Sequence, residues 1–280
     1  MCASHTEITN MSKRNSQTAK TAARERLRQE RERQAKRDKA KRQVIVAASV
    51  VAVLAAAGGI GYAVVQANKP TGWDAARNKP LVKPGNTTGA DGTTVVIGKS
   101  TAQKTLTIYE DPRCPICADF EQKVGPTVKK DVDDGKFKLH YVGATFLDKN
   151  LPGVGSKNAL SALGAALNVS PEAFLEYKAA MYSTKWHPNE TDDKFKDDSY
   201  LIQIADTVPA LKGNAAFQKD VKNGTYDRWA LEEAKIFDKD GIKGTPTLKM
   251  DGKTLTGADG QNPPLSTAEF DKALDAALKG

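Results

Sequence analysis

Hydrophobic residues follow different spacings in different parts of this 280-residue chain. Residues 93–97, 106–109 and 137–142 form short runs that alternate or are β-branched and are bounded by polar residues, which is typical of strands. We expect the first run to be an edge strand and the other two to be central strands. Residues 114–133 lie between the central strands and predict a helix that Gly125-Pro126 interrupts. A strand, a helix and a strand in this order predict a parallel pair.

The spacing becomes helical from about residue 152 to about residue 236. Within this stretch, Ser170-Pro171 places an N-cap before a proline at the first helical position, so a helix begins there. Two more strands follow over residues 247–256, on either side of Asp251-Gly252, which is a strong hairpin turn. Residues 267–278 predict a terminal helix. The pattern therefore predicts an α/β domain with a helical insertion.

An uncharged apolar run of 22 residues extends from Val44 to Val65. A helix of that length rises about 33 Å, which is enough to cross the hydrocarbon core of a bilayer. We therefore predict a transmembrane signal anchor over residues 43–66, although the many alanines and glycines also suit a buried helix of a globular domain. A secretory signal normally has a shorter apolar region. Because Val65-Gln66-Ala67 is a small-residue site, cleavage after Ala67 remains an alternative.

The excess positive charge lies before the apolar run. Residues 1–42 carry 13 Lys and Arg and five acidic residues, a net charge of +8, which equals the formal net charge of the whole chain. By the positive-inside rule we expect this basic tail in the cytoplasm and everything after Gln66 on the outer side of the cell membrane. The tail interleaves Glu with Arg and has no Phe, Tyr or Trp, which favours a solvated helix or a disordered arm near anionic lipid. This composition argues against a nucleic-acid partner.

The rest of the chain divides into a linker and one domain. Residues 67–92 are rich in Asn, Lys, Pro, Gly and Thr, which predicts a linker between membrane and domain. Residues 93–280 are long enough to bury a core, with the helical insertion over about residues 152–236.

The candidate chemistry lies in Cys114-Pro115-Ile116-Cys117. The first cysteine follows a predicted strand and stands at the first turn of a predicted helix, where the helix dipole and backbone N–H groups favour a thiolate. The second cysteine, one turn later, is placed to close a small disulfide with the first. A strand, a Cys-X-X-Cys pair and a helix in this order predict a thiol–disulfide exchange site.

A zinc site and a structural disulfide both suit the cysteine pair less well. A zinc site needs four ligands, and the predicted domain offers only these cysteines and two histidines, His140 and His187. A structural disulfide across two residues would constrain the unfolded chain very little. His140 stands in a strand pattern and His187 in the helical insertion, so we expect structural roles for both. We expect neither a metal nor a cofactor.

The order and spacing of these motifs resemble the DsbA-type branch of the thioredoxin superfamily, in the membrane-anchored form common in Gram-positive bacteria. The resemblance covers about residues 93–280. It rests on the helical insertion and on two motifs, Glu110-Asp111-Pro112-Arg113-Cys114-Pro115-Ile116-Cys117 and Gly244-Thr245-Pro246-Thr247. It implies a thioredoxin-like fold in which Cys114 is the exposed nucleophile and Cys117 the buried resolving thiol. Pro246 would be a cis-proline facing the cysteine pair, and Thr245 would offer backbone hydrogen bonds to an extended substrate.

The chain departs from this family at one position. Many thioredoxin-like proteins bury an acidic residue six positions before the first cysteine, as a proton shuttle for the resolving thiol, and this chain has Ile108 there. Glu110 and Asp111 are the alternatives, although strand alternation can point either side chain to solvent. The dipeptide between the cysteines contains no histidine, so activation of Cys114 would rest on backbone amides, with help from Arg113.

The resemblance implies an extracytoplasmic oxidase that forms disulfides in exported proteins. Its substrates would be exported protein thiols, and a membrane-embedded, quinone-linked thiol oxidase would reoxidise it. A membrane-tethered thiol reductase or disulfide isomerase would use the same cysteines. A non-catalytic binding or chaperone module would keep the fold without turnover. A reduction potential separates oxidase from reductase, and replacing Cys114 by Ser tests the binding module.

Overall fold

The computed structural model describes residues 72–89 and 91–279. Within these residues, no helix has the length and apolar character that crossing a bilayer requires. The predicted basic tail and transmembrane helix, residues 1–66, lie outside the described residues and remain predictions.

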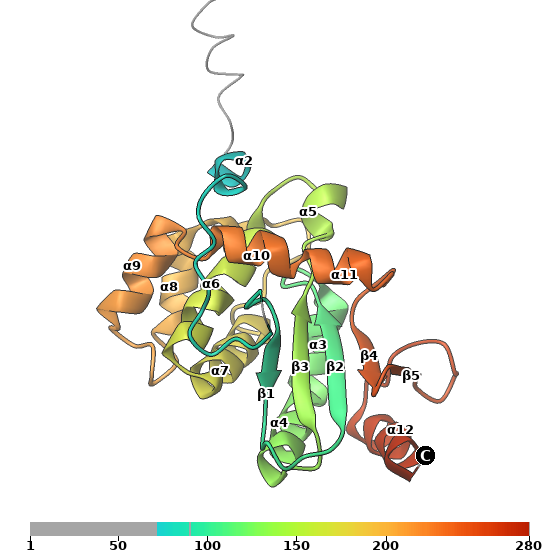
Figure 1. The fold of residues 1–280 in the computed structure, drawn as a ribbon. Helices are drawn as coiled ribbons and strands as arrows, with labels where there is room; N and C mark the ends of the chain where they lie inside the picture. Colours follow the sequence, from blue (N-terminus) through green and yellow to red (C-terminus); the bar gives the residue numbers. More distant parts are fainter. Residues whose placement is uncertain (1–71, 90, 280) are drawn as a thin grey trace, which may run out of the picture. The chain divides into compact units, whose positions relative to one another are not determined.

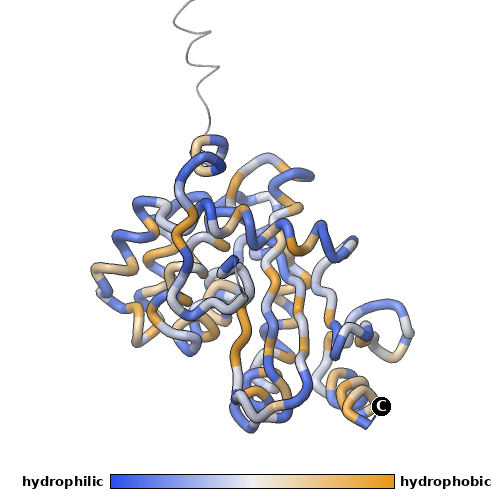
Figure 2. Tube along the Cα trace, viewed as in Figure 1, coloured by the Kyte–Doolittle hydropathy of each residue, from blue (hydrophilic) through white to orange (hydrophobic). Residues whose placement is uncertain are grey.

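Five strands form one mixed sheet in the order β1-β3-β2-β4-β5 (Figure 1). Their bounds are β1 Val95–Ile97, β2 Thr105–Glu110, β3 Lys138–Gly143, β4 Thr247–Met250 and β5 Lys253–Leu255. β2 and β3 run parallel, and the other neighbouring pairs are antiparallel. The predicted edge strand, the two central strands and their parallel pairing are therefore confirmed. β1 is hydrophobic along its whole length (Figure 2) because it consists of two valines and an isoleucine.

The predicted hairpin connects β4 to β5. Asp251 has a φ of 45° and Gly252 a φ of 84°, so both turn residues are in the left-handed region. A two-residue turn with this backbone matches the twist of the strands that it joins, and Asp-Gly is one of the sequences that favours it. The turn chemistry therefore fixes the register of this sheet edge.

Helices cover both faces of the sheet. Figure 1 shows α3 (Pro115–Lys123) and α4 (Gly125–Asp134) behind the strands, and α10 (Asp227–Glu233) and α11 (Lys235–Lys239) in front of them. The predicted interruption between α3 and α4 falls at Val124. The last helix, α12 (Thr267–Lys279), contacts β5.

The helical insertion forms a block of its own beside the sheet. Its remaining elements are α5 (Leu147–Asn150), α6 (Gly155–Val169), α7 (Pro171–Tyr182), a short 3-10 helix (Lys194–Lys196), α8 (Asp198–Ala205) and α9 (Ala215–Asn223). α7 begins as predicted, because the Ser170 hydroxyl accepts a hydrogen bond from the Ala173 N–H at 2.9 Å. Most of α6 is buried, which makes it the centre of this block.

Residues 72–89, predicted as part of the linker, contact the domain. They include the short helix α2 (Gly72–Ala76). The Asn86 side chain donates to the Leu167 carbonyl at 2.7 Å, and the Gly85 N–H donates to the Asn168 side chain at 2.9 Å. This part of the segment is therefore held against the end of α6.

Candidate active site

The cysteine pair lies where β2 ends and the chain turns into α3. Cys114 is the N-cap residue of α3, and Cys117 lies in its first turn. Pro115 occupies the first helical position, where a missing N–H leaves no intrahelical bond unmade. Both cysteines are reduced in this structure. The predicted arrangement of strand, cysteine pair and helix is therefore present.

The nucleophilic cysteine is less accessible than expected. Cys114 is only 6% exposed and Cys117 is fully buried, whereas Ile116 between them is 46% exposed. The expectation of an exposed Cys114 is thus wrong. The physical reason is that the two cysteines belong to one apolar cluster with Leu147 and Tyr182, which covers the thiol.

The two thiols differ strongly in proton affinity. A hydrogen bond with the Cys117 thiol is the largest cause that lowers the pKa of Cys114 to about 6, followed by Thr245 and by the N–H groups of Cys117 and Ile116. Burial raises the pKa of Cys117 well above its usual value, and the charges of Cys114 and Glu110 raise it further. Cys114 is therefore largely a thiolate near neutral pH, whereas Cys117 remains a protonated thiol.

The loop before β4 forms one wall of the site. The Cys114 thiol donates to the Thr245 carbonyl oxygen at 3.4 Å, across 131 residues of chain. The Thr245-Pro246 peptide bond is cis. The structure therefore brings both predicted residues to the cysteine pair, while their contact with a substrate remains a prediction.

Asp111 connects the cysteine loop to the helical insertion. Its carboxylate accepts hydrogen bonds from the Arg113 N–H at 3.0 Å, the Ser156 hydroxyl at 2.6 Å and the Leu147 N–H at 3.1 Å. The side chain is fully buried, and burial raises the pKa of Asp111 to about 7. The cysteine loop and the starts of α5 and α6 therefore meet on this one carboxylate.

Glu110 is also fully buried and points toward α7. Lys178 donates to one Glu110 oxygen at 3.0 Å and also to Glu121. Burial raises the pKa of Glu110 to about 7, and its charge contributes to the high pKa of Cys117. A carboxyl group with a pKa near neutrality, whose charge acts on the resolving thiol, is a candidate for the shuttle role that Ile108 cannot fill. The sequence alone did not indicate Lys178 as the partner of Glu110, because it lies 68 residues from Glu110, in the insertion.

Arg113 has a structural role. Its side chain is 1% exposed and pairs with Asp148 at 3.0 Å and with Asp193 at 3.6 Å. It also donates to the Glu190 carbonyl at 2.9 Å. The main causes of the low Cys114 pKa do not include Arg113. The expected help from Arg113 is therefore not seen, and the guanidinium instead ties the loop to the insertion.

The two histidines lie in structural positions. A His187 ring nitrogen is 3.1 Å from the Pro112 carbonyl oxygen, and the ring stacks on Tyr182 with centroids 5.7 Å apart. His187 thus supports the cysteine loop from the insertion. His140 lies on β3, and its ring is 3.5 Å from the Thr107 hydroxyl. Burial lowers the pKa of both histidines, so both favour the neutral form.

Comparison with known proteins agrees with this geometry. A protein-family model described as thioredoxin matches residues 90–276, about two thirds of the chain. The chain belongs to this thioredoxin family. The cis-proline loop, the Cys-X-X-Cys pair and the sheet are thus parts of one thioredoxin fold with a helical insertion.

Several proteins are similar to this chain. Disulfide bond formation protein D of Bacillus subtilis is 23% identical over 161 residues, which cover 57% of this chain and 68% of that protein. Probable disulfide bond formation protein D of Bacillus cereus is 22% identical over 235 residues, covering 82% and 93%. The crystal structure of oxidised BdbD from Bacillus subtilis has a TM-score of 0.55 at 21% identity, covering 71% of this chain and all of that one. That likeness shows the fold. Together with the paired thiols, the relatives identify this chain as a thiol–disulfide oxidoreductase.

Proposed function

We propose that this thiol–disulfide oxidoreductase is an oxidase that forms disulfides in exported proteins. The opposite shifts of the two thiol pKa values carry the proposal. A Cys114 pKa of about 6 stabilises the reduced pair, and a stabilised reduced pair makes the corresponding disulfide a strong oxidant. The relatives named disulfide bond formation protein D support the same direction of electron flow.

The exchange moves two electrons from two substrate thiols to the Cys114–Cys117 disulfide. A substrate thiolate attacks the Cys114 sulfur, the bond between the two sulfurs breaks, and Cys117 leaves and takes up a proton because its pKa is high. Glu110 is the group that we assign to deliver this proton. A second substrate thiolate then attacks the substrate sulfur of the mixed disulfide. Cys114 leaves as the stabilised thiolate, so both electrons end on the enzyme.

The exposed part of the site is suited to an extended substrate segment. Ile116 is the exposed residue of the motif and offers an apolar contact beside the nearly buried Cys114. The loop at Thr245-Pro246 lies against the same sulfur. A substrate that pairs with the Thr245 backbone would bring its own sulfur to Cys114, which is the positioning that exchange requires.

The proposal includes an extracytoplasmic location on a single membrane anchor, with a quinone-linked membrane thiol oxidase as the reoxidising partner. Its support is the uncharged run from Val44 to Val65 and the basic tail before it. A membrane-impermeant maleimide, applied to intact cells after mild reduction, should label Cys114 and should reach Cys2 only after lysis. Labelling of Cys114 that also requires lysis would refute this location.

The reduction potential of the full-length protein against glutathione tests the direction of electron flow. A value of about −120 to −180 mV would support a disulfide donor. A value near about −270 mV would make the protein a thiol reductase instead. Cys114→Ser is the control, because it should abolish exchange with a reduced model substrate. Full function retained in that variant would show a binding module and not an enzyme.

A further inference from the structure

A basic pocket of about 480 Å³ lies between α5, α6, α10 and α11, near the end of the sheet where β2 and β3 end (Figure 1). Among the described residues, five cationic side chains and two carboxylates line it, so positive charge is in excess. The cations are Arg77, Lys149, Lys157, Arg228 and Lys235, and the carboxylates are those of Glu232 and Asp238. The chain after residue 42 carries no net charge, so this excess is a local feature of the domain.

Three of the cations have only two carboxylates between them. Arg228 lies 2.7 Å from one oxygen of Glu232, and Lys235 lies 2.5 Å from the other oxygen of the same carboxylate. Lys149 pairs with Asp238 at 3.1 Å, and both of these side chains are more than half exposed to solvent. Exposed ion pairs contribute little to stability. The carboxylate of a ligand can therefore join or replace these pairs at small cost.

The other two cations are more loosely paired. Lys157 Nζ lies 3.8 Å from Asp148, whose carboxylate already pairs with Arg113 at 3.0 Å. Arg77 lies 3.8 Å from Asp74, and both side chains are more than half exposed. A separation of 3.8 Å is longer than a hydrogen bond. Lys157 and Arg77 can therefore donate hydrogen bonds to an anion that enters the pocket.

The walls of the basic pocket continue into the walls of the active site. Phe146 lines the pocket and also packs against the apolar cluster that contains Cys114 and Cys117. Phe237 of α11 lines the pocket as well and stacks on Phe146, with ring centroids 5.5 Å apart. The chain after α11 leads to Thr245, whose carbonyl oxygen accepts a hydrogen bond from Cys114. A protein substrate that places its cysteine at Cys114 therefore has the basic pocket beside it.

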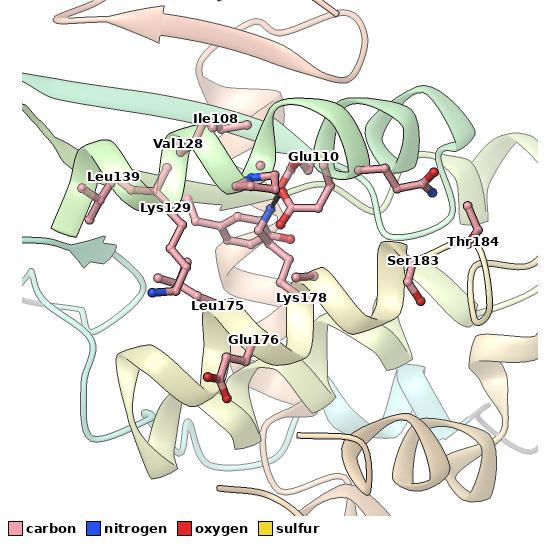
Figure 3. Close-up of a pocket in the computed structure, with 17 residues that line it drawn as sticks. Ile108, Glu110, Val128, Lys129, Leu139, Leu175, Glu176, Lys178, Ser183 and Thr184 are labelled. Atoms are coloured by element: carbon pink, nitrogen blue, oxygen red, sulfur yellow. Dashed lines mark hydrogen bonds and ion pairs between the residues drawn. The ribbon is translucent and has the colours of Figure 1, made fainter. Parts of the chain in front are cut away.

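A second cavity, of about 540 Å³, has the opposite charge balance (Figure 3). It lies between α3, α4, α7 and the sheet, and three carboxylates and two lysines line it among the described residues. Lys178, which Figure 3 shows facing Glu110, already pairs with Glu110 and Glu121. Because like charges repel, an acidic ligand is disfavoured in this cavity and favoured in the basic pocket.

We propose that the basic pocket binds an acidic segment of the protein substrate, close in sequence to the cysteine that reacts with Cys114. This inference rests on the proposed oxidase function and names its substrate class, which is proteins whose cysteines are flanked by Asp and Glu. The carboxylates of such a segment pair with Lys149, Lys157 and Lys235. Complementary charge speeds the encounter and fixes the register of a bound segment, so the preference should appear in kcat/KM.

Oxidation of two matched peptides by the full-length oxidised protein, in a Cys2→Ser background, tests the proposal. Each peptide has two cysteines, which are flanked by Asp and Glu in one peptide and by Lys and Arg in the other. At about 0.01 M salt we expect kcat/KM to be about five- to tenfold higher for the acidic peptide. At about 1 M salt the Debye length is only about 3 Å, and the ratio should fall below about twofold.

Charge variants locate the preference, since flanking charges also change the reactivity of the peptide thiols themselves. Lys149→Glu/Lys235→Glu reverses two exposed cations of the pocket and should lower kcat/KM for the acidic peptide about five- to tenfold. Lys212→Glu/Lys219→Glu makes the same change in net charge at exposed positions that do not line the pocket, and should change it less than about twofold. Lys149→Arg/Lys235→Arg keeps the charge and should keep the preference.

Three results would overturn the proposal. Equal effects of the two charge-reversing variants on the acidic peptide would show that net charge alone is responsible. Loss of binding to phosphatidylglycerol vesicles in Lys149→Glu/Lys235→Glu, with unchanged peptide kinetics, would assign the pocket to a membrane surface. Oxidation of both peptides with no preference at low salt would leave the oxidase function standing without this specificity. Failure to oxidise either peptide would instead refute the proposed oxidase function, and this inference with it.

Discussion

The hydrogen bond between the two thiols sets the acidity of Cys114, and removing it should raise the pKa of that residue. The Cys117 thiol is the largest cause of the low Cys114 pKa of about 6. Cys117→Ala removes this donor, whereas Cys117→Ser replaces it with a hydroxyl that still donates. We expect the Ala variant to titrate well above the wild type and the Ser variant to stay close to it.

The size of the effect follows from the strength of a hydrogen bond to a charged group. Such a bond contributes about 1.5–3 kcal/mol. Because about 1.36 kcal/mol corresponds to one pH unit, the Cys114 titration midpoint in Cys117→Ala should move from about 6 to between about 7 and 8. The remaining depression would come from a hydrogen bond with the Thr245 side chain and from the backbone N–H groups of Cys117 and Ile116.

The assay is the absorbance of the thiolate at about 240 nm as a function of pH, in a Cys2→Ser background so that Cys114 is the only thiol in both Cys117 variants. The rate of alkylation by iodoacetamide gives an independent midpoint. A Cys117→Ala midpoint that remains near 6 would refute the reasoning, because backbone amides and the helix terminus would then suffice. A titration midpoint of Cys117→Ser that rises as far as that of Cys117→Ala would also refute the reasoning.

The same pKa predicts how the redox balance of the wild type depends on pH. The Cys114 pKa is depressed from 9.0 to about 6, so the thiolate stabilises the reduced folded form fully above pH 9 and loses this effect as the pH falls through about 6. At pH 7 the stabilisation is about 1.4 kcal/mol, which raises the two-electron potential by about 30 mV over that of an unperturbed thiol. Two further variants test the buried carboxyls. Asp111→Asn should lower the free energy of unfolding in urea by about 1–3 kcal/mol at pH 5, because an amide cannot accept all three hydrogen bonds. Because the pKa of Asp111 is raised to about 7, its contribution to the stability of the folded protein is complete below pH 3.8 and is lost as the pH rises through about 7. The stability difference between the wild type and Asp111→Asn should therefore shrink toward pH 8. A difference that stays constant with pH would contradict the raised pKa of Asp111. Lys178→Met should cost roughly 3–5 kcal/mol at pH 7, because it leaves Glu110 and Glu121 without their cation. A decrease of less than about 1 kcal/mol in the free energy of unfolding, measured by the same urea titration, would show that these ion pairs contribute little to stability.

Several features of the fold could be predicted from short stretches of sequence, because each is determined by residues that are close together along the chain. Asp251-Gly252 predicts its hairpin through the left-handed backbone of two adjacent residues. Ser170-Pro171 predicts the start of α7 through a cap three residues long. Cys114 and Cys117 predict their chemistry through their place at the end of a strand and the start of a helix.

Other features depend on atoms that meet only after the chain has folded, and no local pattern contains them. Strand alternation could not decide whether Glu110 and Asp111 point to solvent, and both side chains are buried because the insertion covers the end of β2. The partner of Glu110 comes from α7, and the partners of Arg113 come from α5 and from the loop over residues 190–193. The burial of Cys114 likewise results from long-range packing against Leu147 and its neighbours. Local sequence therefore specified the reactive pair and its strand-to-helix setting, whereas its proton affinities and access were set by desolvation and charge, which arise from contacts between distant segments.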